Sequence, residues 1–186
     1  MIGVAEERLK LKRSTAAAML VTLTCLVQVL SPPGSALKLV GFPVILSGFL
    51  LGPGYGAMVG AVSDILGYLL YPAGPFFPGF TLTQALTGAI PAAVLGHRRV
   101  HQLGSRALPW LVLAIGLGQL VTSVLMVSGF LTLLYGLPFW AQATYRGISQ
   151  LVHVPIYAWL AWKVLDSLEA DPRVAAELTR LRPRLE

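Results

Sequence analysis

Six apolar stretches recur along the chain, most of them long enough to cross a lipid bilayer as a helix. About 20 helical residues, each rising roughly 1.5 Å, span the hydrocarbon layer. The stretches cover residues 14–30, 36–51, 55–71, 80–96, 108–135 and 141–163. A backbone in lipid must satisfy its hydrogen bonds internally, and these stretches lack the two-residue alternation of barrel strands. The sequence therefore predicts an all-α integral membrane protein, a six-helix bundle.

The low charge content of the chain favours lipid over water as its surroundings. Of the 186 residues, 55% are hydrophobic and 12% are charged, whereas about a quarter of a soluble domain is charged. This length suits one membrane domain over residues 1–186, with a charged tail at 166–186. A basic start before an apolar run is also typical of a signal peptide, but the prolines at 32 and 33 fit that alternative poorly.

Basic residues gather on one side of the predicted bundle. If the six segments alternate across the membrane, twelve of the fourteen Lys and Arg residues lie on the side of both termini: Arg8, Lys10, Lys12, Arg13, Arg98, Arg99, Arg106, Lys163, Arg173, Arg180, Arg182 and Arg184. Cytoplasmic loops carry such an excess, so both termini are predicted to be cytoplasmic in a multi-pass protein of the cell membrane. Anionic lipid accounts for the positive charge, and no nucleic-acid partner is expected.

Polar and aromatic side chains concentrate near the outer helix ends. The candidates are Asp64, Tyr68, Phe76, Phe77, Thr81, Gln84, Trp140, Arg146 and Gln150, with Lys38 close to the first outer loop. Arg146, Gln150 and His153 are spaced four and three apart, so they share one helix face. Ionisable groups in a membrane generally face a partner or an aqueous cavity. Two interpretations stay open: a salt bridge between Asp64 and Arg146 beneath an aromatic belt, and a ligand pocket.

Small residues recur every four positions in several segments. Glycines occupy positions 48, 52, 56 and 60, and Ser14, Ala18 and Thr22 form a similar stripe on the first segment. Such stripes let helix backbones approach closely in lipid. The stripe on the first segment fits either a seam within this chain or a surface for another membrane protein.

The region between residues 43 and 96 carries a family resemblance. The run GAMVGAVSDILGYLLYPAGPFFPGFTLTQALTGAIPAAVLG (56–96), preceded by PVILSGFLLGP (43–53), resembles the membrane-embedded substrate-binding subunits, or S components, of energy-coupling factor (ECF) vitamin importers of the folate family. Its most specific pieces are SDILG at 63–67 and FPGFTL at 77–82, and the match continues more weakly through YRGISQLVHVPIY (145–157). Six helices with both termini inside agree with that family.

The resemblance implies a division of labour. Such a subunit captures a vitamin at the extracellular face and reorients in the membrane to deliver it, driven through a transmembrane coupling subunit by two cytoplasmic ATPases. The two alanines of the family's coupling stripe align with Ala18 and Thr22, so we expect Ser14, Ala18 and Thr22 to contact the coupling subunit. The chain contains no glycine-rich phosphate loop ending in Gly-Lys-Ser/Thr, so we do not expect it to be an ATPase or another enzyme.

Folate suits the polar and aromatic groups near the outer ends. Its pterin ring would stack between Phe77 and Trp140, and its aminopyrimidinone edge would pair with the Asp64 carboxylate, although Asp64 could equally brace the helices. Arg146 and Lys38 would neutralise the glutamate tail. Lysine at 38, where many folate-type relatives are expected to have arginine, leaves another anionic vitamin such as pantothenate as an alternative.

A small secondary transporter is the alternative from another class. Such transporters usually show inverted repeats and more intramembrane ionisable residues, and we find no repeat across the two halves of this chain. No metal site or cofactor is expected.

Overall fold

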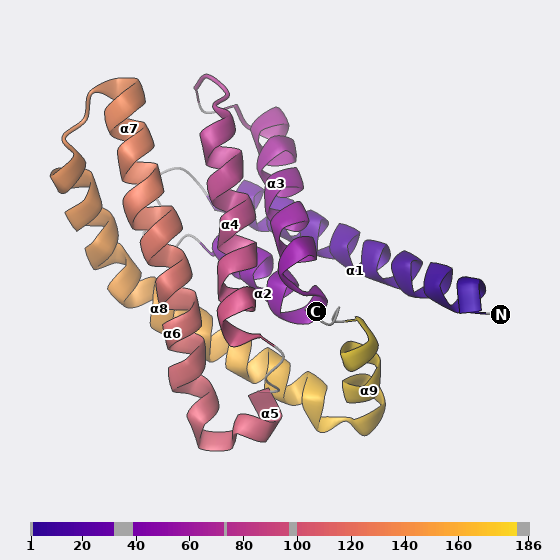
Figure 1. Cartoon of the computed structure of the whole chain (residues 1–186). Helices are drawn as coiled ribbons and strands as arrows, with labels where there is room; N and C mark the ends of the chain where they lie inside the picture. Colours follow the sequence, from indigo (N-terminus) through magenta and orange to yellow (C-terminus); the bar gives the residue numbers. More distant parts are fainter. Residues whose placement is uncertain (1, 32–38, 73, 97–99, 182–186) are drawn as a thin grey trace.

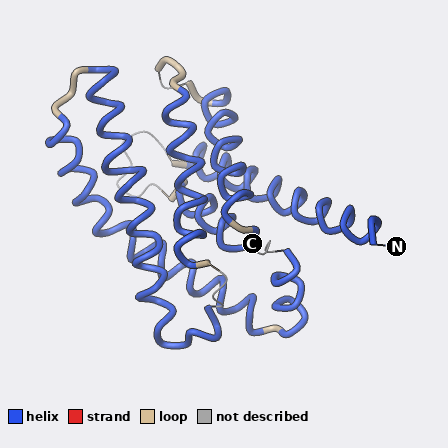
Figure 2. Tube along the Cα trace, viewed as in Figure 1, coloured by secondary structure: helices blue, strands red, loops and turns tan. Residues whose placement is uncertain are grey.

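The computed structural model describes residues 2–31, 39–72, 74–96 and 100–181, and every regular element in these ranges is helical (Figure 2). The long helices are α1 (Ile2–Leu30), α2 (Gly41–Leu51), α3 (Pro53–Leu70), α4 (Pro78–Leu95), α6 (Ala107–Gln119), α7 (Val127–Tyr135) and α8 (Phe139–Ala170). A π-helical stretch, η2 (Leu120–Met126), joins α6 to α7 without a break. The shorter elements are α5 (Val100–Leu103), the 3₁₀ turn η1 (Gly104–Arg106) and α9 (Pro172–Leu181).

The helices coincide with the six predicted apolar segments wherever those segments are described. The fifth segment is the continuous rod of α6, η2 and α7, and the start of the second segment, 36–38, lies outside the described residues. Two boundaries differ from the expectation. Helix α1 begins at Ile2 rather than near residue 14, because Glu, Arg, Lys and Leu in that stretch are all good helix formers. Helix α8 continues to Ala170 and stops there because Pro172 disfavours a helical residue before it.

Proline and glycine mark the other helix boundaries. Pro53, Pro78 and Pro172 open α3, α4 and α9, where a missing N–H costs nothing. Helix α7 ends at Gly136, whose φ of 65° lies in the left-handed region that glycine adopts without strain.

Two helical stretches of the described chain are long and apolar enough to cross a membrane by length and composition. They are Glu6–Leu30 and Ala107–Tyr135, and α2 is a shorter apolar helix. Helices α3, α4 and α8 interrupt their apolar residues with glycine, proline, hydroxyl and charged side chains.

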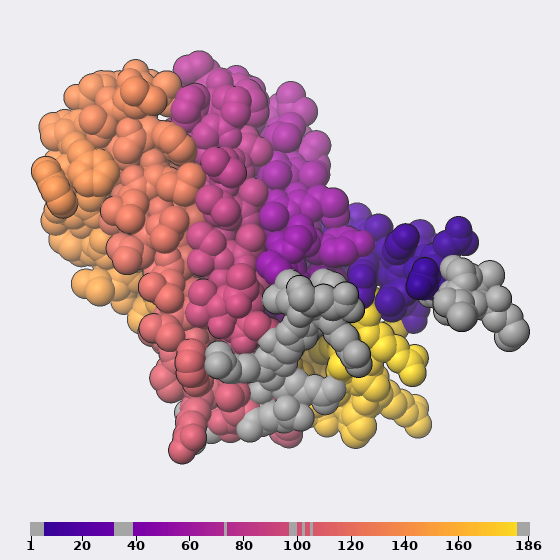
Figure 3. All heavy atoms as spheres, viewed as in Figure 1, coloured from indigo at the N-terminus to yellow at the C-terminus, as the bar shows by residue number. Residues whose placement is uncertain are grey.

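The connections after α3 and after α7 lie at one end of the bundle, and α5 and α9 lie at the other (Figure 1). Helices α3, α4 and the α6–α7 rod run side by side, whereas α1 crosses the bundle obliquely. The beginning of α1 projects from the body of the molecule (Figure 3).

Helices α2, α3 and α4 touch backbone to backbone at three glycines. A Cβ atom built on Gly48 would lie 2.1 Å from the carbonyl oxygen of Gly88, and one built on Gly56 would lie 2.7 Å from both that oxygen and the Gly48 Cα. Real Cβ atoms do not approach neighbours so closely, so this three-helix contact requires glycine. The predicted small-residue packing of the glycines at 48 and 56 is confirmed here.

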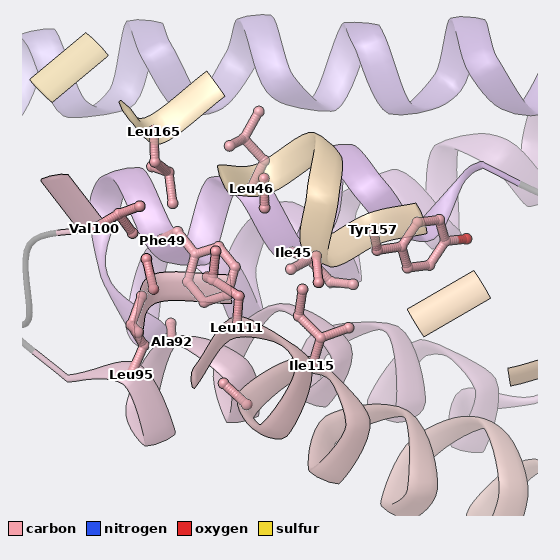
Figure 4. Packing of buried hydrophobic residues seen from close by; sticks show 14 of the residues in the cluster. Ile45, Leu46, Phe49, Ala92, Leu95, Val100, Leu111, Ile115, Tyr157 and Leu165 are labelled. Atoms are coloured by element: carbon pink, nitrogen blue, oxygen red, sulfur yellow. The ribbon is translucent and has the colours of Figure 1, made fainter. Parts of the chain in front are cut away.

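The apolar core lies where α2, α4, α6 and α8 meet (Figure 4). Ile45, Leu111, Ile115 and Leu165 are fully buried there. Tyr157 closes one side of this core, with its hydroxyl directed away from the apolar side chains (Figure 4). The core is thus apolar toward the α5 end, and Tyr157 forms its border with the polar part of the bundle.

Helix α9 folds back against the beginning of α1. Lys12 forms an ion pair with Glu177, and the Arg13 guanidinium donates to the backbone carbonyl of Arg180 at 2.9 Å. Leu181 packs against a buried cluster that includes Ala17. The charged tail therefore contains a short helix after Pro172 that docks on α1.

We expect Gly48→Ala to destabilise the protein by about 1–3 kcal/mol, because the added methyl group forces α2 away from α4. Thermal unfolding of the purified protein in detergent measures the change. Gly129→Ala is the matched control, since a Cβ at Gly129 meets nothing within 4 Å. In a helix interior that control should be neutral or stabilising by about 0.5–1 kcal/mol. Equal unfolding temperatures for the two variants would contradict the glycine contact.

We expect the docking of α9 on α1 to weaken in acid. The hydrogen bond and charge of Lys12 lower the pKa of Glu177 below its ordinary value. Because the docked state lowers this pKa, the ionised carboxylate stabilises docking. That stabilisation is complete above the pKa of an undocked glutamate, about 4.3, and is lost as the pH falls through the lower pKa of the docked state. Pulsed electron paramagnetic resonance between labels at Thr15 and Ala176 would report the separation. Glu177→Gln should remove the pH dependence, and an unchanged titration in that variant would exclude the ion pair as its cause.

Candidate functional site

A cavity of about 510 Å³ lies between α4, the α6–α7 rod, α8 and the start of α2. Twelve of its fifteen lining residues carry polar side chains. The lining residues are Val40, Gly41, Thr83, Gln84, Thr87, Gln119, Thr122, Ser123, Val127, Tyr145, Arg146, Ser149, Gln150, His153 and Tyr157. Those on α4 lie in the half of the helix that follows the connection after α3, and most of those on α8 lie in the half that follows the connection after α7. The volume is within the range of roughly 300–1,000 Å³ that is typical of small-molecule sites.

Arg146 and Gln150 present unpaired polar atoms in this lining. The Nε of Arg146 and the Oε1 of Gln150 are buried and have no hydrogen-bond partner in the described part of the chain. The two residues are one helical turn apart on α8 and share its cavity face. Arg146 carries the permanent positive charge among the described lining residues, and none of these residues is a carboxylate. An anionic ligand with a donor group would satisfy both orphan atoms.

Threonine hydroxyls form one wall of the cavity. The Thr87 hydroxyl lies 2.8 Å from the Thr83 carbonyl oxygen and 3.1 Å from the Thr122 hydroxyl, which lies 2.9 Å from the Gly118 carbonyl oxygen. These contacts join α4 to η2. A Cβ on Gly118 would lie 2.8 Å from the Pro91 ring, so α4 also approaches the end of α6 closely, one turn further along.

His153 and Tyr157 close the inner side of the cavity. The His153 Nδ1 lies 2.7 Å from the Ser149 carbonyl oxygen, an acceptor, so this nitrogen carries a proton. The rings of His153 and Tyr157 are edge to face, with centroids 5.8 Å apart. Tyr157 also hydrogen-bonds the backbone of Gly41. These contacts tie α8 to the start of α2 beneath the cavity.

Asp64 does not line the cavity. Its Oδ2 accepts a hydrogen bond from the Thr81 hydroxyl at 2.7 Å, which links α3 to α4. Asp64 and Arg146 form no ion pair in the described part of the chain. The salt-bridge interpretation is therefore wrong, and the alternative in which Asp64 braces two helices agrees with its contact to Thr81.

The aromatic candidates also lie outside the cavity lining. Phe77 packs edge to face against Phe80 and Phe130, with centroids 5.6 and 5.1 Å apart. The rings of Tyr68 and Phe76 pair at 5.2 Å. Trp140 is 79% exposed. Phe77 and Trp140 therefore do not face each other across the cavity. Phe77 packs on neighbouring aromatic rings, and Trp140 lies on the surface of the protein.

Three predicted ligand residues line the cavity, and one falls on an undescribed segment. Gln84, Arg146 and Gln150 are brought together from α4 and α8. Lys38 lies outside the described residues. On α1, the predicted coupling residues Ser14, Ala18 and Thr22 are all exposed, while Ala17 and Thr24 turn into the bundle.

Twelve of the fifteen lining residues were not among the predicted ligand residues, and Thr87 and Tyr157 are two of them. A signal for each was present in the sequence. Thr87 follows Thr83 by four positions, and Tyr157 extends the face of Arg146, Gln150 and His153 by one further turn. Among the described residues, no three His, Cys, Asp or Glu side chains gather to hold a metal ion.

Known proteins similar to this chain include folate transporters. A folate transporter FolT of Clostridium novyi (strain NT) is 32% identical over 136 residues, which cover 72% of this chain and 76% of that protein. The folate transporter FolT of Streptococcus mutans serotype c is 23% identical over 171 residues, covering 90% of this chain and 92% of that protein. A crystal structure of FolT bound with folic acid matches the fold with a TM-score of 0.65 at 24% identity, covering 83% of this chain and 96% of that one.

The family model for the ECF transporter, substrate-specific component, matches residues 12–166. This match spans all of the residues that line the cavity and most of α1. Subunits of this family bind a substrate for transport and are not enzymes. The chain therefore belongs to the family of membrane-embedded, substrate-specific components of ECF transporters.

Proposed function

We propose that this chain binds folate at the extracellular face of the cell membrane and delivers it to the cytoplasm as the S component of an ECF importer. The observation that carries the proposal is the unpaired Arg146 in a polar cavity without a lining carboxylate among the described residues. The similarity to the FolT proteins supports folate as the ligand.

The lining groups match the two ends of folate. Arg146 would bind a carboxylate of the glutamate tail. The aminopyrimidinone edge has both donors and acceptors, and the amides of Gln84 and Gln119 can supply the complementary groups. We therefore assign the aminopyrimidinone edge to these two amides and not to the Asp64 carboxylate, which lies outside the cavity lining. Lys38 remains a candidate second cation from the sequence alone.

We further propose that the whole chain is one domain with six membrane spans and both termini in the cytoplasm. The spans would be α1, α2, α3, α4, the α6–α7 rod and α8. Arg106, Lys163, Arg173 and Arg180 occupy the elements at the α5 and α9 end of the bundle, which suits the positive-inside rule. The cavity then opens in the half of the bundle toward the outside.

The proposed partners are a transmembrane coupling subunit and two cytoplasmic ATPases. Ser14, Ala18 and Thr22 lie exposed at intervals of four on α1, which gives another helix a smooth surface for close approach. Engagement there would let the loaded bundle reorient in the membrane. The energy comes from the ATPases, since this sequence has no phosphate-binding loop of its own.

We expect Arg146→Ala to weaken folate binding roughly tenfold to 150-fold. This range corresponds to the loss of a charged hydrogen bond of about 1.5–3 kcal/mol. Equilibrium binding of radiolabelled folate to the purified protein measures it, with unlabelled pantothenate as competitor.

Asp64→Asn is the control for this prediction, because Asp64 is ionisable but lies outside the cavity lining. It should change folate affinity less than threefold. Negligible folate binding by the unaltered protein would refute folate as the ligand, and displacement by pantothenate at similar concentrations would favour pantothenate.

We expect Ala18→Trp to reduce ATP-dependent folate uptake by more than tenfold while leaving folate binding to the isolated subunit unchanged. The bulky ring would separate α1 from the coupling subunit. Uptake by cells that express the complete transporter measures the effect. Met19→Trp is the matched control, since Met19 is 68% exposed on a different stripe of the same helix. Equal uptake by the two variants would exclude the stripe as the docking surface.

A further inference from the structure

Gln150 is held by a hydrogen bond that leaves its acceptor oxygen unused. Its Nε2 donates to the Ser123 hydroxyl at 3.0 Å, so the amide is fixed with Oε1 as the free end. That Oε1 is buried and has no hydrogen-bond partner in the described ranges. A buried acceptor without a donor is unfavourable, so the arrangement is suited to a ligand that brings an N–H group.

Arg146 stands one helical turn before Gln150 on the same face. Its Nε–H is a buried donor that is also unpaired in the described part of the chain. Side chains four apart on a helix are neighbours, with Cβ atoms about 6 Å apart. A cationic donor and a neutral acceptor therefore lie side by side, and their complement is an anion with a hydrogen-bond donor beside it.

We infer that Gln150 is a specificity-determining residue that accepts an N–H hydrogen bond from the ligand beside the carboxylate bound by Arg146, and that Ser123 is its positioning residue. The chemical class that fits is an N-acyl amino acid, in which the amide N–H and the carboxylate are attached to the same carbon. Folate contains this group where its glutamate is joined to the aromatic ring system. The inference rests on the proposed function and identifies which part of the ligand this site recognises.

The position of Ser123 depends on unusual backbone geometry. Ser123 lies within the π-helical stretch η2, between two α-helices. Such stretches are rare and occur frequently at functional sites. Here η2 directs Ser123 to Gln150, while the preceding Thr122 contacts Thr87 on α4.

The test compares folic acid with an analogue in which oxygen replaces the N–H of the glutamyl amide. The analogue keeps the carboxylates and the ring system and lacks one donor. We expect the unaltered protein to bind folic acid at least tenfold more tightly than the analogue. In Gln150→Leu this ratio should fall below twofold, because the acceptor is gone. Gln142→Leu is the matched control, since Gln142 lies on the same face of α8 but does not line the cavity, and it should keep the ratio.

Further variants separate positioning from folding. Ser123→Ala should lower the ratio while leaving binding of the analogue unchanged, and Ser123→Thr should restore it by keeping the hydroxyl. Gln150→Glu should weaken folic acid more than tenfold, because the new carboxylate competes for Arg146. If Gln150→Leu fails to fold, the Ser123 variants and Gln150→Glu decide the question.

The outcomes distinguish this inference from the proposed function. If the unaltered protein binds neither compound, both fail. If it binds folic acid and the analogue equally, or if Gln150→Leu keeps the full ratio, the role of Gln150 is refuted and the folate-binding function stands.

Discussion

The backbone contact of Gly48, Gly56 and Gly88 is the constraint on which the arrangement of the bundle depends. It holds α2, α3 and α4 together without side chains between them. Van der Waals packing of this kind is one of the attractions that hold helices together in lipid, where apolar burial gains little. Because α4 is fixed in this way, it can present Thr83, Gln84 and Thr87 to the cavity.

Helix α8 contributes its later part to the apolar core and its earlier part to the lining of the cavity. Toward Leu165 the helix packs in an apolar cluster, and from Tyr157 to Tyr145 it faces hydroxyls and amides. Most of the neutral polar groups bond to one another or to backbone carbonyls. Arg146 and Gln150 each keep a buried atom without a hydrogen-bond partner in the described part of the chain. Two neighbouring side chains of one helix are therefore the ones available to bind a ligand.

Helical periodicity made part of this molecule predictable and left the rest open. The positions of the helices followed from apolar length, with proline and glycine at the ends, and the shared face of Arg146 and Gln150 followed from their spacing. The places of Asp64, Phe77 and Trp140 did not follow, because they depend on contacts between helices. Asp64 accepts a hydrogen bond from Thr81 on the next helix, and the Phe77 ring packs against Phe130 on α7. Spacing along one helix carries no information about such partners.

The docking of α9 gives the chain a mechanical path between its two ends. Helix α8 runs unbroken from Arg146 to Ala170, turns at Asp171, and continues as α9, which is fastened to Lys12 and Arg13 on α1. A lateral force on α1 would therefore reach the cavity through the tail as well as through the bundle. Cutting the chain at Asp171 would remove the path through the tail and leave the direct contacts of α1 with α2 and α3 to transmit the force.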